Sequence, residues 1–218
     1  MDFRAVIFDL DGTLLDTLED IADAMNSVLE AHGYLSHETD AYRHFVGDGV
    51  NTLVKRVLPE GTRDDETVAG LVKAYREAYG IYWKLKTQPY EGVPEMLDML
   101  TARQLKLAVL SNKPDDFTKM CVRELLSQWT FHIVLGYRDE IPAKPDSAGA
   151  LEIAEQLEIP PGDFLFLGDT AVDMETAVAA GMYPVGALWG FRSQTELMCG
   201  GAKKVIERPQ EVLSLLDK

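Results

Sequence analysis

Short apolar runs without polar alternation recur along this chain of 218 residues, and they constrain its fold more than any other feature. Runs of this length, with β-branched or aromatic side chains, are typical of strands that are buried on both faces of a parallel sheet. The runs are AVIF (5–8), LKLAVL (105–110), HIVLG (132–136), FLFLG (164–168), YPVGAL (183–188) and KKVIE (203–207).

Helical patterns lie between the later runs. VPEMLDMLTARQ (93–104) has Pro94 at a helix start, and SAGALEIAEQLE (147–158) has apolar residues at helical spacing. VDMETAVAAGM (172–182) contains Gly181, a residue that commonly ends a helix. Strands that alternate with helices predict an α/β fold with a doubly wound parallel sheet.

One interval, between Asp16 and about Lys86, breaks this alternation because it contains no convincing strand. Its segments have helical periodicity, and residues 16–19 resemble a capping box at the start of the first helix. The predicted helical segments are TLEDIADAMNSVLEAHG (17–33), DGVNTLVKRVL (48–58) and DDETVAGLVKAYREAYGIYWKL (64–85). Roughly 70 residues of helix are too many for one crossover, which indicates a separate unit.

The sequence therefore predicts a helical cap domain over residues 16–86, inserted into an α/β core domain of residues 1–15 and 87–218. We expect the cap to move relative to the core. The hinges are predicted at the two crossings, near Leu14–Thr17 and near Lys86–Gly92.

Charge and cysteine content exclude several classes of protein. The 21 Lys and Arg residues against 36 Asp and Glu residues give a net charge of −15, which argues against a nucleic-acid partner. The two cysteines belong to no CxxC pair and are expected to be free thiols in a reducing cytoplasm. No signal peptide or membrane span is expected, and the protein is predicted to be cytoplasmic, as a monomer or a homodimer.

Polar residues follow four of the apolar runs directly or after a short loop. In a parallel sheet these positions meet at one edge, where ligands bind in open α/β folds. They are Asp9, Asp11 and Thr13 after the first run, Ser111, Asn112 and Lys113 after the second, Lys144 after the third, and Asp169, Thr170 and Asp173 after the fourth.

Four carboxylates in one small volume repel one another, by roughly 4 kcal/mol for two unit charges about 4 Å apart at an effective dielectric constant of about 20. The cluster therefore needs a cation. Oxygen ligands without His or Cys point to a hard ion such as Mg²⁺. Taken singly, these residues also fit helix caps and turns, and for Asp173 a capping role is compatible with a functional one.

The stretch DLDGT suggests a division of labour between two carboxylates. Asp9 and Asp11 lie on the same side of an extended segment, because side chains alternate with a period of two. One carboxylate can attack a phosphorus atom and form an aspartyl-phosphate, while the other protonates the departing alkoxide and later activates water. Gly12 permits a tight turn whose amides can face phosphate oxygens.

These residues resemble the motifs of the haloacid dehalogenase (HAD) superfamily. DLDGT matches the first motif, Ser111 in VLSNKP the second, Lys144 in PAKPDS the third, and Asp169 with Asp173 in LGDTAVD the fourth. All four occur in order over nearly the whole chain. The acid at the second position of DLD resembles the phosphate-transferring branch rather than the dehalogenases, and the helical insert resembles a C1-type cap.

The resemblance implies a role for each matched residue. Asp9 would be the nucleophile and a Mg²⁺ ligand, and Asp11 the general acid and base, with its backbone carbonyl on the metal. Asp169 would be the third ligand, supported by Asp173. Phosphate oxygens would be held and their charge neutralised by five residues: Gly12, Thr13, Ser111, Asn112 and Lys144.

The cap loop FVGDGVNTLVKRVL (45–58), together with PYEGV (89–93) and WGFRS (189–193), resembles the phosphoglycolate phosphatases. That resemblance implies a Mg²⁺-dependent phosphatase of a small phosphorylated metabolite such as 2-phosphoglycolate. Arg43, Gly47 and Arg56 are the candidate substrate contacts in the cap. It is equally open that the glycines of this loop only flank a helix start and that the cations lie on a solvated face.

Other functions share much of this pattern. A phosphosugar mutase, similar to β-phosphoglucomutase, would pass the phosphoryl group to a sugar, and an inorganic pyrophosphatase of the same superfamily is a further alternative. Phosphonoacetaldehyde hydrolysis needs a cap lysine, for which Lys55 is a weak candidate. A phospho-acceptor signalling module would place acidic residues similarly but would lack a large helical lid. No P-loop, GxGxxG or GxSxG motif is present.

Overall fold

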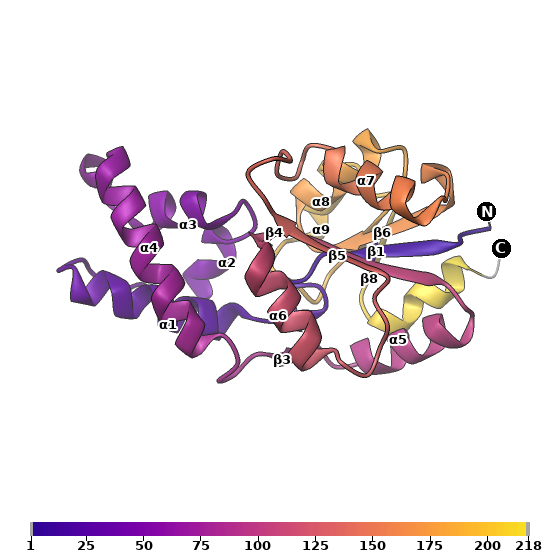
Figure 1. The fold of residues 1–218 in the computed structure, drawn as a ribbon, viewed down its shortest axis with the longest axis horizontal. Helices are drawn as coiled ribbons and strands as arrows, with labels where there is room; N and C mark the ends of the chain where they lie inside the picture. The colour runs from indigo at the N-terminus through magenta and orange to yellow at the C-terminus, as the bar shows by residue number, and fades with distance from the viewer. Residues whose placement is uncertain (1, 217–218) are drawn as a thin grey trace.

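A parallel six-stranded sheet forms the centre of the computed structural model, which describes residues 2–216. Its order is β5-β4-β1-β6-β7-β8, and every neighbouring pair is parallel (Figure 1). The strands are β1 (Ala5–Phe8), β4 (Lys106–Pro114), β5 (Ile133–Tyr137), β6 (Phe164–Gly168), β7 (Tyr183–Ala187) and β8 (Lys204–Ile206). Each predicted apolar run is therefore a strand, and the predicted fold class is confirmed.

The central strand shows why the apolar runs lack alternation. β1 pairs with β4 on one side and β6 on the other, and all four of its side chains are fully buried. Val6 and Phe8 belong to the core cluster that includes α5, whereas Ala5 and Ile7 belong to the cluster with α7 and α8. Helices thus cover both faces, as a doubly wound sheet requires.

Three α-helices of the core lie in the predicted helical segments: α5 (Val93–Ala102), α7 (Ala148–Leu157) and α8 (Ala171–Ala179). The predicted segments do not include α6 (Asp115–Leu125) and α9 (Gln194–Cys199), nor the short 3₁₀ helices η3 (Pro161–Asp163) and η4 (Pro209–Leu215). Pro94 lies at the start of α5. Gly181 adopts φ of +72° just after α8, which confirms it as the residue that ends this helix.

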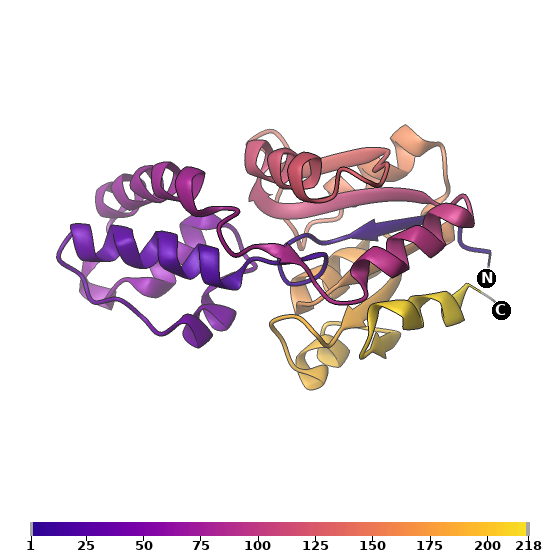
Figure 2. The ribbon, with the colours of Figure 1, turned by 90° about the horizontal axis from the view of Figure 1, so that it is seen from below.

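A separate helical lobe lies at one end of the sheet (Figures 1 and 2). It contains α1 (Leu18–Ala31), α2 (Tyr42–Phe45), α3 (Val50–Val57) and α4 (Asp65–Tyr82), with the short helices η1 (Thr39–Ala41) and η2 (Glu60–Thr62). Helices α1 and α4 pack together along their apolar sides, with Met25, Leu29 and Tyr79 almost fully buried. We call this lobe the cap.

Two crossing segments join the cap to the core. β2 (Leu15–Asp16) and β3 (Gln88–Pro89) pair antiparallel, and Figure 2 shows them between the two lobes. The buried carboxylate of Asp20, in the first turn of α1, accepts hydrogen bonds from the backbone of Lys86 and from both donors of Thr87, at 2.7–3.1 Å. These hydrogen bonds connect the start of α1 to the segment that leads from the cap back to the core. The hinges predicted at these crossings stay a prediction.

The predicted capping box at residues 16–19 is wrong. Thr17 is the N-cap of α1, but it has helical backbone angles and its side chain makes no capping hydrogen bond. A side chain in that conformation does not face the free amides of the first turn. None of the described helices is long and apolar enough to cross a membrane.

Candidate active site

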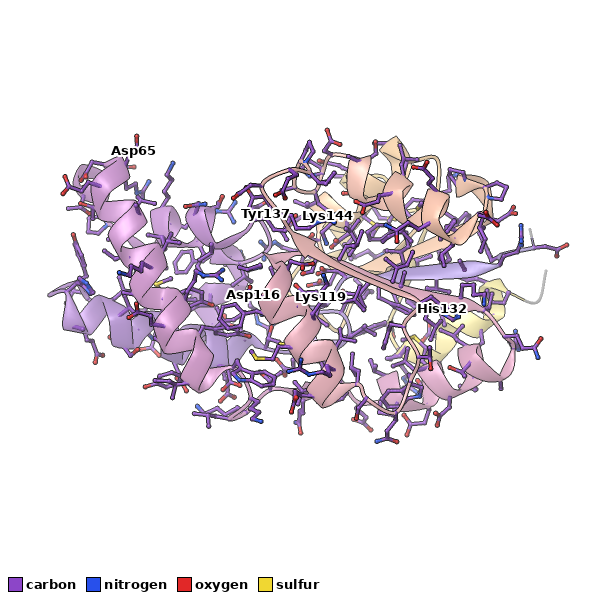
Figure 3. All side chains as sticks on the ribbon, in the orientation of Figure 1. Asp65, Asp116, Lys119, His132, Tyr137 and Lys144 are labelled. Atoms are coloured by element: carbon purple, nitrogen blue, oxygen red, sulfur yellow. The ribbon has the colours of Figure 1, made fainter. Side chains whose placement is uncertain are left out.

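The carboxyl ends of β1, β4 and β6 meet at the edge of the sheet that faces the cap, where Figure 3 labels Lys144. Ligand oxygens of Asp9, Asp169 and Asp173 lie within 4.8 Å of one another there, and all three residues are buried. Residues from the ends of β1 and β6 and from the start of α8 therefore form one acidic cluster. The structure brings these sequence-predicted carboxylates together.

Lys144 is the cation of this cluster. Its Nζ donates to Asp9 Oδ1 at 2.8 Å and to Asp173 Oδ1 at 2.6 Å, and only 4% of its side chain is exposed. Burial alone would lower the pKa of Lys144, but the Asp173 and Asp9 carboxylates outweigh it and hold that pKa above its ordinary value. Lys144 is therefore a fixed positive charge beside Asp9.

The side chain of Asn112 positions Lys144. Its Oδ1 accepts from the Lys144 backbone N–H at 2.9 Å, and its Nδ2 donates to the Lys144 carbonyl at 3.0 Å. The same Nδ2 lies 3.1 Å from the carbonyl of Gly47 in the cap loop. Asn112 therefore links the end of β4, the loop after β5 and the cap, and its contact with phosphate stays a prediction.

Asp173 also caps a helix. Its Oδ2 accepts from the Thr170 backbone N–H at 3.0 Å and from the Thr170 hydroxyl at 2.7 Å, and a complete capping box begins α8. With Oδ1 on Lys144, both oxygens are engaged. Asp173 thus fits a supporting position beside a metal better than a direct ligand.

Asp169 is held from two sides. Thr13 Oγ1 donates to its Oδ1 at 3.0 Å, and the Phe191 backbone N–H donates to its Oδ2 at 2.8 Å. Gly12, at φ of +88°, lies so close that a Cβ there would collide with the Asp169 carboxylate, and a Cβ on Gly190 would do the same. Gly190 and Phe191 belong to the WGFRS stretch noted in the sequence, but no local pattern shows that this loop after β7 returns to the same edge of the sheet.

Electrostatics indicate that the cluster requires an additional cation. Burial raises the pKa of Asp9 from 3.8 to about 7, with Lys144 opposing that rise and Asp173 adding to it. Burial, and then the charges of Asp9 and Asp173, also raise the pKa of Asp169 well above its ordinary value. Lys144 alone does not balance three carboxylates, and an all-oxygen donor set of this kind fits a hard divalent ion.

Asp11 has a different partner. Both of its carboxylate oxygens lie 2.9 Å from Nζ of Lys113, at the end of β4. The same Nζ lies 4.4 Å from the ring centroid of Tyr79 on the cap helix α4. The sequence predicts that Lys113 lies at this edge of the sheet, but none of the motifs predicts a function for it. The metal contact predicted for the Asp11 carbonyl stays a prediction.

A cavity of about 600 Å³ of empty space, part of it open to solvent, lies between this edge and the cap. Asp9, Asp11 and Ser111 form part of its core wall. Most of the cap wall is apolar or aromatic, and comprises Ile21, Val46, Val50, Leu53, Tyr75 and Tyr79, next to the backbone of Gly47 and Gly49. Lys113 and Arg76 are the cationic side chains among the lining residues that the structure describes.

Arg43 and Arg56, two of the predicted substrate contacts in the cap, are not among the residues that line the cavity. Arg43 pairs with Asp40 and donates to the Gly190 carbonyl of the core at 3.0 Å. Arg56 forms an ion pair of 2.6 Å with Asp48 and bonds the carbonyl of Phe45. Gly47, the third candidate, does line the cavity. Substrate contact by the three residues stays a prediction.

Several polar contacts close the cap onto the core. Arg43 of the cap bonds a core carbonyl, and Arg192 of the core bonds the cap carbonyl of Val46 at 2.9 Å, so the two arginines act reciprocally. Arg76 on α4 forms a 2.6 Å ion pair with Asp116 on α6, which Figure 3 labels on the side of the core nearest the cap. The structure thus shows a cap in contact with the site.

Comparisons with known proteins agree with this geometry. Residues 6–187 match the family model described as haloacid dehalogenase-like hydrolase. The chain is 32% identical over 214 residues to a phosphoglycolate phosphatase of Aquifex aeolicus, covering 98% of this chain and 97% of that one. It is 34% identical to a phosphoglycolate phosphatase of Psychrobacter arcticus over 88% of this chain and 86% of the relative.

A similar solved structure comes from Lactobacillus delbrueckii subsp. bulgaricus and carries the provisional name phosphoglycolate phosphatase. It superposes with a TM-score of 0.93 at 27% identity and covers 99% of both chains. The match includes the cap as well as the core, because nearly the whole chain is aligned. The chain therefore belongs to the haloacid dehalogenase-like hydrolase family, as a member of its phosphatase type.

Proposed function

We propose that this protein is a Mg²⁺-dependent phosphatase that hydrolyses a small phosphomonoester through an aspartyl-phosphate on Asp9. The observation that carries the proposal is the separate support of two carboxylates from one strand end. Asp9 lies against Lys144 in the acidic cluster, and Asp11 lies against Lys113. Two carboxylates with different partners are suited to different roles in one reaction.

The reaction proceeds in two steps. In the first, an Asp9 carboxylate oxygen attacks phosphorus, the bond from phosphorus to the ester oxygen breaks, and Asp11 gives its proton to the departing alkoxide. In the second, Asp11 takes a proton from water, the water oxygen attacks phosphorus, and the bond to Asp9 breaks. Inorganic phosphate leaves and Asp9 is regenerated.

Fixed donors around Asp9 stabilise the charge of the transferring group. Lys144, 2.8 Å from Asp9, would offset negative charge on a phosphoryl group at Asp9, and Ser111 is among the residues that line the cavity beside it. Asp9, Asp169 and the backbone carbonyl of Asp11 would hold Mg²⁺, with Asp173 in support. The ion supplies positive charge that offsets both the carboxylates and the phosphate.

A small anionic substrate fits the cavity. The relatives named above are phosphoglycolate phosphatases, and 2-phosphoglycolate has a two-carbon leaving group that ends in a carboxylate. Lys113 is paired with Asp11, which leaves Arg76 as the described cation on the cavity wall that can attract such a carboxylate, and the apolar remainder limits the access of water to the reacting groups. We therefore propose 2-phosphoglycolate, or a similar small phosphate, as the substrate.

Phosphate release from a panel of substrates tests the proposal. The panel contains 2-phosphoglycolate, hexose phosphates, nucleotides and pyrophosphate, each with and without Mg²⁺. We expect Mg²⁺-dependent release that is fastest with 2-phosphoglycolate and lost in Asp9→Asn. Conversion of a hexose 1-phosphate to the 6-phosphate without phosphate release would instead identify a mutase, and preference for pyrophosphate would identify a pyrophosphatase.

A further inference from the structure

The ion pair between Lys113 and Asp11 has no assigned role in the motifs above. Lys113 Nζ lies 2.9 Å from both carboxylate oxygens of Asp11, and the two side chains are 5% and 18% exposed. Burying an ammonium group is costly unless it is paired, so the position of this lysine requires a specific partner. Asp11 is the carboxylate that supplies it.

An aromatic ring of the cap lies over the lysine, and rings from both lobes pack against that ring. Tyr79 of the cap helix α4 lies over its Nζ at 4.4 Å from the ring centroid. Tyr79 stacks on Tyr75 at 5.5 Å and meets Phe117 of the core helix α6 edge to face at 5.1 Å. Because α4 belongs to the cap, this arrangement is complete only when the cap lies against the core.

The backbone of Lys113 is anchored as well. Its carbonyl accepts a hydrogen bond of 3.1 Å from the hydroxyl of Thr118, and its N–H lies 3.3 Å from Oγ of Ser111. Lys113 is thus held at both ends: its backbone by Thr118 and Ser111, and its ammonium group by Asp11 and the Tyr79 ring. A fixed donor that contacts both oxygens restricts rotation of the Asp11 carboxyl group about its Cβ–Cγ bond.

We propose that Lys113 is a positioning residue that aims the Asp11 carboxyl at the leaving-group oxygen, and that Tyr79 of the cap completes its setting. This inference rests on the proposed phosphatase function. In the first step, one Asp11 oxygen carries the proton given to the ester oxygen while the other accepts from Lys113. Closure of the cap therefore also aligns the Asp11 carboxyl, because it brings Tyr79 over Lys113.

The dependence of the rate on the leaving group tests this role. Substituted phenyl phosphates share one phosphoryl group, but p-nitrophenolate departs without help whereas phenolate benefits from protonation. The ratio of kcat/KM for phenyl phosphate to that for p-nitrophenyl phosphate isolates the first step. We expect Lys113→Met to lower this ratio by about 10-fold or more, and Lys113→Arg to restore most of it.

Two controls separate positioning from folding and from phosphate binding. Asp11→Asn should lower the same ratio, and adding Lys113→Met to it should cause no further fall, since the carboxyl that the lysine aims is gone. Tyr79→Phe should keep the wild-type ratio, whereas Tyr79→Leu should lower it. If circular dichroism shows that Lys113→Met does not fold, the comparison of Tyr79→Phe with Tyr79→Leu tests the inference instead.

Equal losses for the two substrates in Lys113→Met, or a further fall of the ratio in the double variant, would overturn the inference. So would an unchanged ratio in Tyr79→Leu if Lys113→Met does not fold. In each case the proposed phosphatase function would be intact. Failure of the wild-type protein to hydrolyse any aryl phosphate with Mg²⁺ would instead overturn the proposed function itself.

Discussion

The two walls of the cavity differ in what they are made of. The core wall, at the strand ends, carries charged side chains in ion pairs: Asp11 with Lys113 at 2.9 Å, and Asp9, which Lys144 holds at 2.8 Å. The cap wall is mostly apolar, and Arg76 is its cationic residue among those that the structure describes. A reaction that moves charge needs fixed donors and acceptors, whereas selection needs shape and one or two charges. We therefore expect the core to carry out the chemistry and the cap to select the substrate.

The largest effect is expected for Asp9→Asn. The amide cannot serve as the attacking oxygen, so kcat for phosphate release with Mg²⁺ should fall by about 10⁴-fold or more. Asp65→Asn is the matched control, because Asp65 is exposed at the start of α4 in the cap (Figure 3) and should leave kcat unchanged. A folded Asp9→Asn variant that retained activity would place the chemistry elsewhere.

Lys144→Met should give the next largest loss. Removing the cation 2.8 Å from Asp9 withdraws charge from the transferring phosphoryl group, and kcat should fall by about 10²- to 10³-fold. Lys119→Met removes an exposed lysine of α6 and should change kcat little. Similar losses in the two variants would show that general surface charge, not the lysine of the site, assists the reaction.

Arg76→Ala tests whether the cap selects substrates that carry a carboxylate. If Arg76 attracts the substrate carboxylate, KM for 2-phosphoglycolate should rise by about 10-fold, and KM for phenyl phosphate should change little. Asp116→Ala is the matched control, because it breaks the same 2.6 Å ion pair but keeps the cation. Equal effects of the two variants would make Arg76 a latch between the lobes. A changed Mg²⁺ requirement in Arg76→Ala would show that the cap also takes part in metal binding.

The acidic cluster makes the metal-free protein sensitive to pH. Since burial raises the pKa of Asp9 from 3.8 to about 7, the folded protein holds that proton more tightly than the unfolded chain. The contribution of Asp9 to stability is therefore present below pH 4 and lost as pH rises to about 7. We expect the melting temperature of metal-free Asp9→Asn to exceed that of the wild type at pH 8, with little difference at pH 4.

The same melting experiment with Mg²⁺ tests whether the ion binds at the cluster around Asp9. Mg²⁺ should raise the melting temperature of the wild-type protein at pH 8 more than that of Asp9→Asn, because the ion offsets charge on the carboxylate that the variant lacks. Equal shifts in the two proteins would show that the cluster around Asp9 is not the site where the ion binds.

The smallest effect concerns the thiols. Cys121 is fully buried on α6, and burial raises its pKa to about 11, whereas Cys199 is exposed. Iodoacetamide reacts with thiolates, so it should modify Cys199 first and Cys121 at least about 10-fold more slowly. Mass spectrometry of peptides measures both rates. Comparable rates would show that the region of α6 beneath the cap opens readily to solvent.

The core could be predicted from the sequence because its signals are local. Each strand is a continuous apolar run, and site residues such as Asp9, Ser111 and Asp169 directly follow a strand. Parallel pairing then brings the strand ends together without further information. The same logic placed Lys144 near the site, although its contact with Asp173 depends on the loop after β5.

Contacts between the lobes could not be predicted in this way. Helical periodicity correctly predicts a helix within residues 64–85, but it does not say which core residues that helix contacts. The positions of Arg76 and Lys113 depend on how α4 lies against α6. The return of Phe191 to Asp169 likewise depends on the path of a loop. Such contacts arise from tertiary packing, which no short pattern records.

Trapping the phosphoryl group is a direct test of Asp9 as the nucleophile. Asp11→Asn lacks the base that activates water, so an aspartyl-phosphate formed from p-nitrophenyl phosphate and Mg²⁺ should accumulate. Acid quenching, peptide digestion and mass spectrometry should find the phosphoryl group on Asp9 in the peptide that begins the core, and on no cap residue. If the wild-type protein turns over substrate but the trapped variant has no phosphoryl group on Asp9, or has it on another residue, Asp9 is not the nucleophile.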